Sequence, residues 1–281
     1  MSSVKSEEHL IGEKVDDNVH KALETFIKKM GYRENPKILG IVFYGSSLTG
    51  YSSKDSDVDV HVITTNTSEL IRGVTNISGF KIEYFEKPIL DLYMTTENEF
   101  NSQNNAILAM IGCGEIIYER KGIITALQDY IKIKYANGML PLEPDEAKET
   151  VCVIDNRMIR LQKMLEIDDP DFDHNYHLYL ERIRTFYHRL LGCPEIPASK
   201  VRRIYTDVAF RTSFCKDYVP DDDFIYMYLE AISCTGSKEE KMRLIRELFD
   251  YSRRNVLIDP GEYRIPVKSR NDGMASSHKF M

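Results

Sequence analysis

The spacing of apolar positions changes along the chain and predicts its first elements. In residues 16–32 the apolar positions recur every three or four residues, which predicts a helix that ends at Gly31. Residues 38–44 are a short apolar run and residues 58–63 alternate strictly between apolar and polar, so both predict strands. Two extended stretches on either side of the sequence NISG predict a hairpin that ends in the strand FKIEYF.

The remainder of the first half continues to mix the two periods. A helix is predicted from about Pro88, another around NNAILAMI, a short strand at EIIYER and a helix at ITALQDYIKIKYA. This order of helices and strands predicts an α/β (α+β) domain with a mixed sheet over residues 1–140.

After residue 140 nearly every segment has the helical period. The segments between the expected helices contain turn and capping residues. The expected helices cover residues 145–167, 173–191, 197–214, 221–233 and 237–251. We therefore expect an all-α helical bundle domain over residues 141–260, followed by an irregular tail over residues 261–281.

Composition and charge restrict the class of protein. The hydrophobic fraction of 42% and the charged fraction of 29% are those of a globular protein. No apolar run approaches the roughly 20 residues that span a bilayer, and the first residues lack the pattern of a signal peptide, so we expect a cytoplasmic protein without a membrane partner. The net charge of -7 disfavours broad binding to nucleic acid but allows a local basic site.

The cysteines argue against two kinds of site. There are 5 of them, an odd number, and they are widely spaced without a CxxC pair. This pattern disfavours both a disulfide framework and a zinc site, and predicts cysteines that act as small buried apolar residues.

Two aspartates lie one residue apart at the start of the strand predicted at residues 58–63. Side chains at alternate positions of a strand share a face, so Asp57 and Asp59 are expected to point the same way. Parallel carboxylates repel each other and favour protonation unless a cation keeps them ionised. Mg²⁺ binds such hard oxygen ligands and usually shares them with phosphates of a substrate. The pair therefore predicts a Mg²⁺ site.

A Gly-Ser turn precedes the two aspartates. Gly45 allows the chain to turn tightly after the strand at residues 38–44. Ser46 and Ser47 supply hydroxyl and backbone N–H groups near the start of a short helix, where anions are favoured. The turn is therefore expected to hold phosphate groups beside the metal site.

Taken together, the turn and the aspartates resemble the signature of the nucleotidyltransferase superfamily, which has the fold of DNA polymerase β. That signature is an apolar residue, Gly, and Gly or Ser, followed after a spacer by Asp, an apolar residue and a second acidic residue. FYGS and SDVDV match it at every position. In its plan of a small catalytic domain before a helical domain, the chain is similar to aminoglycoside nucleotidyltransferases and related small bacterial enzymes. The resemblance in residues covers 36–120.

The resemblance implies an enzyme that transfers a nucleoside monophosphate from a nucleoside triphosphate to a hydroxyl group, with release of pyrophosphate. We expect AMP from ATP as the donor group and a small molecule such as an antibiotic as the acceptor. Asp57 and Asp59 would hold one or two Mg²⁺ ions, which can stabilise the attacking and the leaving oxygens. Gly45, Ser46 and Ser47 would hold the phosphates.

Members of the superfamily typically carry a third carboxylate on a later strand of the same sheet. The strand FKIEYFEKP offers Glu83 and Glu86, which have opposite parity. Glu83 lies in the middle of the alternation and is the expected catalytic and metal-binding residue, whereas Glu86 at the strand exit is expected to be solvated. Whether Glu83 binds metal only or also acts as a general base stays open.

Basic residues gather at the front of the helix expected at residues 197–214. In the superfamily, helical domains often send a Lys or Arg to the triphosphate, so the resemblance makes Lys200 an expected phosphate ligand. A solvated basic face remains the alternative.

Two other functions stay open at this stage. The chain could be a nucleotidyltransferase that acts on RNA or protein in a toxin-antitoxin or defence system, or a non-catalytic nucleotide-binding module. The acidic net charge favours a small acceptor over nucleic acid. Both a monomer and a homodimer are compatible with the sequence.

Overall fold

A computed structural model describes residues 17–51, 56–65 and 70–256 of the chain. The described residues form two compact units. Unit 1 comprises those up to Leu140 together with Gly192–Val219, and unit 2 comprises Pro141–Leu191 and those from Pro220 onward. The chain first passes from unit 1 to unit 2 between Leu140 and Pro141, and residues 192–219 group with the sheet and not with the helical bundle. The expected irregular tail over residues 261–281 lies outside the described residues.

Unit 1 is built on a five-stranded sheet with the strand order β3-β4-β2-β1-β5. Strands β2 and β4 are parallel, whereas the other neighbouring strands are antiparallel, so the predicted mixed sheet is confirmed. The strands are β1 Ile38–Tyr44, β2 Val58–Thr64, β3 Ile71–Ile77, β4 Phe80–Pro88 and β5 Glu115–Glu119. Ser78 and Gly79 connect β3 to β4 with φ of 53° and 87°, which suits a tight hairpin turn.

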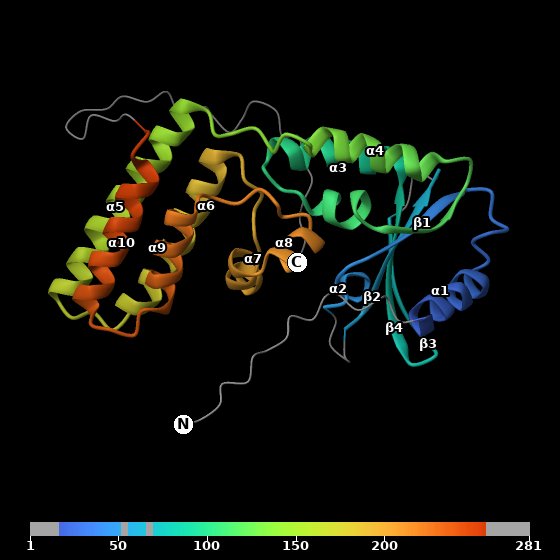
Figure 1. The fold of residues 1–281 in the computed structure, drawn as a ribbon, viewed down its shortest axis with the longest axis horizontal. Coiled ribbons are helices and arrows are strands. Elements are labelled where there is room, and N and C mark those ends of the chain that lie inside the picture. Colours follow the sequence, from blue (N-terminus) through green and yellow to red (C-terminus); the bar gives the residue numbers. More distant parts are fainter. Residues whose placement is uncertain (1–16, 52–55, 66–69, 257–281) are drawn as a thin grey trace. The chain divides into compact units, whose positions relative to one another are not determined.

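Helices cover both faces of this sheet, as Figure 1 shows. Helix α1 (Asp17–Met30) buries its apolar stripe, including Leu23 and Phe26, in a cluster with Val60 of β2. The helix ends at Gly31, whose φ of 66° a glycine adopts without a steric cost.

The second face of the sheet is covered by α3 (Ile89–Asn101), the π-helical turn η1 (Leu108–Gly112) and α4 (Ile123–Tyr135). Leu92, Ile111 and Leu127 from these elements pack in one cluster with Val42 and Ile63 of the sheet. Because alternate residues of β2 share a face, Asp59 lies on the same side as Ile63.

Residues 192–219 differ from the single helix expected over residues 197–214. They contain a 3-10 turn η2 (Ala198–Lys200) and two short helices, α7 (Val201–Thr206) and α8 (Val208–Ser213). The break lies at Asp207, which has extended backbone angles and accepts a hydrogen bond from the Phe210 backbone N–H at 2.9 Å. An aspartate that caps the following helix ends the preceding one. The expectation of one continuous helix is therefore wrong.

A disulfide joins Cys113, just after η1, to Cys215, just after α8. The two residues are 102 positions apart, so their spacing could not reveal the pairing. The expectation of cysteines without a disulfide is wrong for this pair. Cys152 and Cys193 are buried, as expected.

The described part of unit 2 is a bundle of four helices: α5 (Pro144–Glu166), α6 (Phe172–Leu191), α9 (Asp222–Ser233) and α10 (Lys238–Arg253). Fully buried residues such as Ile183, Tyr228 and Leu248 form its interior, and the predicted helical domain is confirmed. Side chains of Asp221 and Ser237 accept backbone N–H groups at the starts of α9 and α10. Among the described residues, no helix has the length and the apolar character needed to cross a membrane.

Candidate active site

The strand register brings the predicted carboxylates of β2 and β4 together. Asp59 pairs with Glu83 across the parallel strands and with Tyr44 across the antiparallel pair. Side chains at paired positions of neighbouring strands share a face, so Asp59 and Glu83 are direct neighbours. Glu86 has the opposite parity, and its carboxylate accepts a hydrogen bond from Tyr32 Oη at 2.6 Å instead of being fully solvated. The register thus distinguishes the two glutamates.

Two of the three carboxylates form salt bridges with side chains of the sheet. Lys81 Nζ lies 2.8 Å from Asp57 Oδ2, and Arg72 Nε donates to Glu83 Oε1 at 2.8 Å. The side chains of Lys81 and Arg72 are largely exposed, so breaking these two salt bridges costs little free energy. With these pairings in place, the described residues contain no group of three or more His, Cys, Asp or Glu side chains that converges like a metal site.

Asp59 carries negative charge that the neighbouring lysines do not fully compensate. Its pKa is raised to about 6, mainly by burial and also by the adjacent carboxylates of Glu83 and Asp57, while Lys200 and Lys81 lower it. A divalent cation would reverse this effect, and carboxylate oxygens are the ligands that hard cations prefer. Asp57 and Asp59 therefore fit such an ion, provided that the salt bridge between Lys81 and Asp57 breaks.

The raised pKa of Asp59 predicts how the stability of the metal-free protein depends on pH. The folded chain holds the proton more tightly than the unfolded chain, so this group lowers stability as pH rises from about 4 to about 6. At pH 7 the free energy of unfolding of Asp59→Asn should therefore exceed that of the wild type by about 1–2 kcal/mol, since solvent screens part of the effect. At pH 4 the two proteins should be about equally stable. Urea unfolding of both proteins in EDTA at pH 4 and pH 7 measures this stability difference. The same difference at both pH values would contradict the prediction.

The Gly-Ser turn between β1 and helix α2 (Ser46–Thr49) packs directly against Asp59. Gly45 has a φ of 90°, and a Cβ atom at this position would lie 2.6 Å from Asp59 Oδ2. Only glycine therefore combines this backbone conformation with the carboxylate beside it.

Ser46 and Ser47 occupy different positions at this turn. Ser46 lines a pocket beside Asp59. Ser47 is buried and its hydroxyl donates to the Asp57 carbonyl oxygen at 3.0 Å, so this hydroxyl holds the turn against the start of β2. The Ser47 hydroxyl is therefore engaged within the turn, and phosphate binding by Ser47 stays a prediction.

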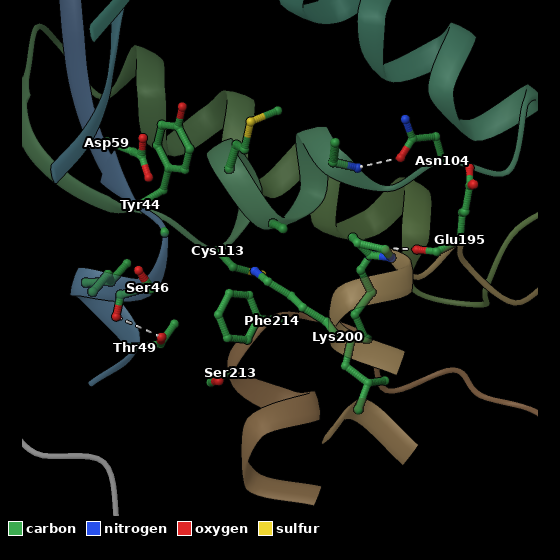
Figure 2. Close-up of a pocket in the computed structure, with 18 residues that line it drawn as sticks. Tyr44, Ser46, Thr49, Asp59, Asn104, Cys113, Glu195, Lys200, Ser213 and Phe214 are labelled. Atoms are coloured by element: carbon green, nitrogen blue, oxygen red, sulfur yellow. Dashed lines mark hydrogen bonds between the residues drawn. The ribbon is translucent and has the colours of Figure 1, made fainter. Parts of the chain in front are cut away.

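A cavity of about 450 Å³ in unit 1 opens beside the turn and the carboxylate. Gly45, Ser46 and Asp59 line one part of it, and residues 192–219 form the opposite wall. Figure 2 shows Lys200 reaching from this wall past Phe214 toward the side on which Ser46 and Asp59 lie. The Lys200 ammonium lies 4.1 Å from the centre of the Phe214 ring.

The charge of Lys200 is coupled to that of Asp59. Burial lowers the pKa of Lys200, and the Asp59 carboxylate partly offsets this. The pocket thus places the Lys200 ammonium opposite the Asp59 carboxylate. Lys200 is half-buried and does not belong to a solvated basic face, whereas its neighbours Arg202 and Arg203 are exposed.

A second lysine, which the sequence pattern does not reveal, lines this pocket. Lys216 is only 8% exposed, and burial lowers its pKa to about 8. Its ammonium donates to Asn105 Oδ1 and, at 2.9 Å, to the Glu195 carbonyl oxygen. In the sequence, Lys216 belongs to a polar stretch before a proline that is typical of a solvated turn, so no signal in the pattern indicates its burial.

Comparison with known proteins agrees with this geometry. Residues 22–109 match the model of the nucleotidyltransferase domain family. This part of the chain is similar to nucleotidyltransferase domains. The match runs from α1 into η1, so the domain model includes Gly45, Asp57, Asp59 and Glu83 but ends before Lys200.

Beyond residues 22–109, comparison with known proteins adds little information about this chain. No curated protein matches the chain. Of 11 matching chains among solved structures, one is a nucleotidyltransferase-like protein from Exiguobacterium sibiricum 255-15. It has 15% sequence identity and a TM-score of 0.47, over 84% of this chain and 74% of that one. A likeness at this level says nothing about activity.

Proposed function

We propose that this protein transfers a nucleoside monophosphate from a nucleoside triphosphate to a hydroxyl group of an acceptor and releases pyrophosphate. The observation that carries the proposal is the cavity in which Gly45, Ser46 and Asp59 face Lys200. The nucleotidyltransferase domain supports the reaction class. A module that only binds nucleotides would have no need for Asp57, Asp59 and Glu83 on one face of a sheet.

In this proposal the triphosphate binds between the two walls of the pocket. Ser46 and the adjacent backbone would bind the terminal phosphates, and Lys200 would neutralise part of their charge from the opposite wall. Gly45 keeps the turn close enough to Asp59 for phosphates and carboxylate to meet. The aromatic face of Phe214 supports Lys200 and limits its freedom.

Asp57 and Asp59, with Glu83 beside them, would hold one or two Mg²⁺ ions. When bound, such ions neutralise charge on the phosphates and on the oxygens that attack and leave. Because Glu83 is the direct neighbour of Asp59, it would either complete the metal site or accept the proton of the acceptor hydroxyl.

The donor is proposed to be ATP and the acceptor a small hydroxylated molecule such as an antibiotic. The volume of about 450 Å³ is in the range of small-molecule sites, which supports a nucleotide inside the pocket. The net charge of -7 supports a small acceptor over a polyanion.

Label transfer from four nucleotides tests the reaction and its substrates. The protein is incubated with Mg²⁺ and ATP, GTP, CTP or UTP, labelled at the α-phosphate or, in parallel reactions, at the γ-phosphate. The acceptors are aminoglycosides, lincosamides, bulk tRNA or none. We expect the α-label on an acceptor and γ-label only in pyrophosphate. Transfer of the γ-label instead would mean phosphoryl transfer, and no transfer together with no rise in melting temperature with Mg²⁺ and any nucleotide would contradict the proposal.

Lys200→Met should weaken the binding of Mg-ATP about tenfold, because a charge-assisted contact to phosphate is lost while the packing on Phe214 stays. Lys200→Arg should retain most of the affinity. Calorimetric titration measures both. Arg202→Met is the matched control, since Arg202 is exposed and does not line the pocket. Equal losses in Lys200→Met and Arg202→Met would contradict a specific role for Lys200.

A further inference from the structure

Residues 192–219 contact the rest of unit 1 at several places, among them Tyr218 to Ala136 and Phe210 to Tyr51. The segment around Cys215 is attached to residues 103–113. The Glu195 N–H donates to the Gln103 carbonyl oxygen at 3.3 Å. The Lys216 ammonium and the Cys215 carbonyl oxygen both bind the side chain of Asn105, the latter at 3.0 Å. Beside these hydrogen bonds, the disulfide between Cys113 and Cys215 is the covalent connection. The part of the opposite pocket wall around Phe214 and Cys215 is therefore held by this attachment.

The disulfide lies next to the groups that face the reaction. Cys215 directly follows Phe214, whose ring supports the Lys200 ammonium, and Cys113 itself lines the pocket. The backbone of Cys215 has a φ of 52°, a conformation that is unfavourable for a residue with a side chain. The bonds made by Cys215 and Lys216 hold this turn, and with it the position of Phe214.

The disulfide is also accessible. Cys113 is exposed, Cys215 is half-buried, and both line a second cavity of about 210 Å³ in unit 1. Cys152 and Cys193, by contrast, are buried thiols. Exposed disulfides exchange with external thiols more readily than buried ones and are often regulatory. In reducing compartments, disulfides are mostly transient and serve catalysis or redox sensing.

We infer that the disulfide between Cys113 and Cys215 is a redox switch of nucleotide binding, which rests on the function proposed above. An external dithiol transfers two electrons and two protons to it: the S–S bond breaks, Cys113 and Cys215 become thiols, and the dithiol becomes a disulfide. Reduction leaves residues 192–219 attached only by non-covalent contacts such as those of Asn105. The wall then moves more freely, Lys200 and Phe214 lose their fixed place, and the affinity for the triphosphate falls.

The test compares oxidised and dithiothreitol-reduced full-length protein in two measurements. Calorimetric titration with Mg-ATP should give about fivefold weaker binding after reduction, the lower end of typical coupling between sites. Hydrogen exchange without nucleotide should show faster exchange in peptides from residues 192–219 and unchanged exchange in β1 and β2. Mass spectrometry of the oxidised protein should find the Cys113–Cys215 peptide pair.

Two variants separate the disulfide from general effects of the reductant. Cys215→Ser should bind Mg-ATP as weakly as the reduced wild type under both conditions. Cys234→Ser, which removes a free thiol in unit 2, should respond to reduction as the wild type does. If Cys215→Ser does not fold, the comparison of oxidised and reduced wild type still decides.

The outcomes distinguish this inference from the proposed function. Equal affinity and equal exchange in both redox states, or no Cys113–Cys215 pair in the oxidised protein, would overturn the switch and leave the nucleotidyltransferase proposal standing. Nucleotide binding in neither state would contradict the proposed function. That result would overturn a switch of nucleotide binding as well, whatever the exchange of residues 192–219 shows.

Discussion

Asp57→Asn and Asp59→Asn should each lower nucleotide transfer by at least about 10³-fold while the fold is retained. Asparagine keeps the size of the side chain but removes the charge that would hold a metal ion. Asp57 lies at the start of β2 and its salt bridge with Lys81 is exposed, so the stability of Asp57→Asn should change little. Transfer assays together with circular dichroism and melting temperatures measure both effects.

Asp129→Asn is the matched control for these two variants. Asp129 is an exposed residue of α4 that does not line the pocket, so transfer should stay at the wild-type rate. Unchanged transfer in Asp57→Asn or Asp59→Asn would contradict the assigned roles. A loss that Asp129→Asn shares would point to a general effect of charge.

Gly45→Ala should reduce transfer by about 10²-fold or more, because the new Cβ atom would overlap with Asp59 Oδ2 at 2.6 Å. Misplacement of a reacting group by about 1 Å is enough for a loss of this size. The variant should also be less stable by about 1–2 kcal/mol, since alanine disfavours a positive φ. Steady-state kinetics and urea unfolding measure the two effects separately.

Gly79→Ala separates the backbone effect from the displaced carboxylate. Gly79 has a φ of 87°, close to the 90° of Gly45, but no atom lies within 4 Å of the position of its Cβ. We expect a similar loss of stability with nearly normal transfer. If Gly79→Ala lost transfer to the same extent, strain alone would explain the effect, and the contact between Gly45 and Asp59 would not matter.

Much of the fold could be predicted because its local signals agree with its packing. The run at residues 38–44 and the alternation that begins at Val58 are strands with nearly the expected bounds, since each has branched residues that bury one or both faces. The hairpin between β3 and β4 follows from turn residues at Ser78 and Gly79. These signals act over a few residues and therefore survive in the sequence pattern.

The course of residues 192–219 could not be predicted for the opposite reason. Asp207 can lie inside a helix or cap a new one, and its local sequence does not decide between them. The placement beside η1 depends on contacts such as Lys216 to Asn105, 111 positions apart. The disulfide with Cys113 is of the same kind, because only the fold brings its two residues together.

The candidate site shows the same division between local and distant information. The motif around Gly45 and Asp59 is local, and the register of β4 supports the choice of Glu83 as their neighbour. The use of the Ser47 hydroxyl within the turn and the burial of Lys216 required three-dimensional contacts. The assigned roles of Asp57, Asp59, Glu83 and Lys200 remain predictions that the variants above test.

The division of unit 1 into two sequence segments has a consequence for synthesis of the chain. Domains fold as the chain emerges from the ribosome, N-terminal parts first. The sheet with its carboxylates is complete once Leu140 has emerged, but the opposite wall of the pocket follows only with residues 192–219, after α5 and α6 have been made. A nascent chain of this protein therefore carries its acidic cluster long before it can enclose a nucleotide, and closure of the pocket is a late step of its biogenesis.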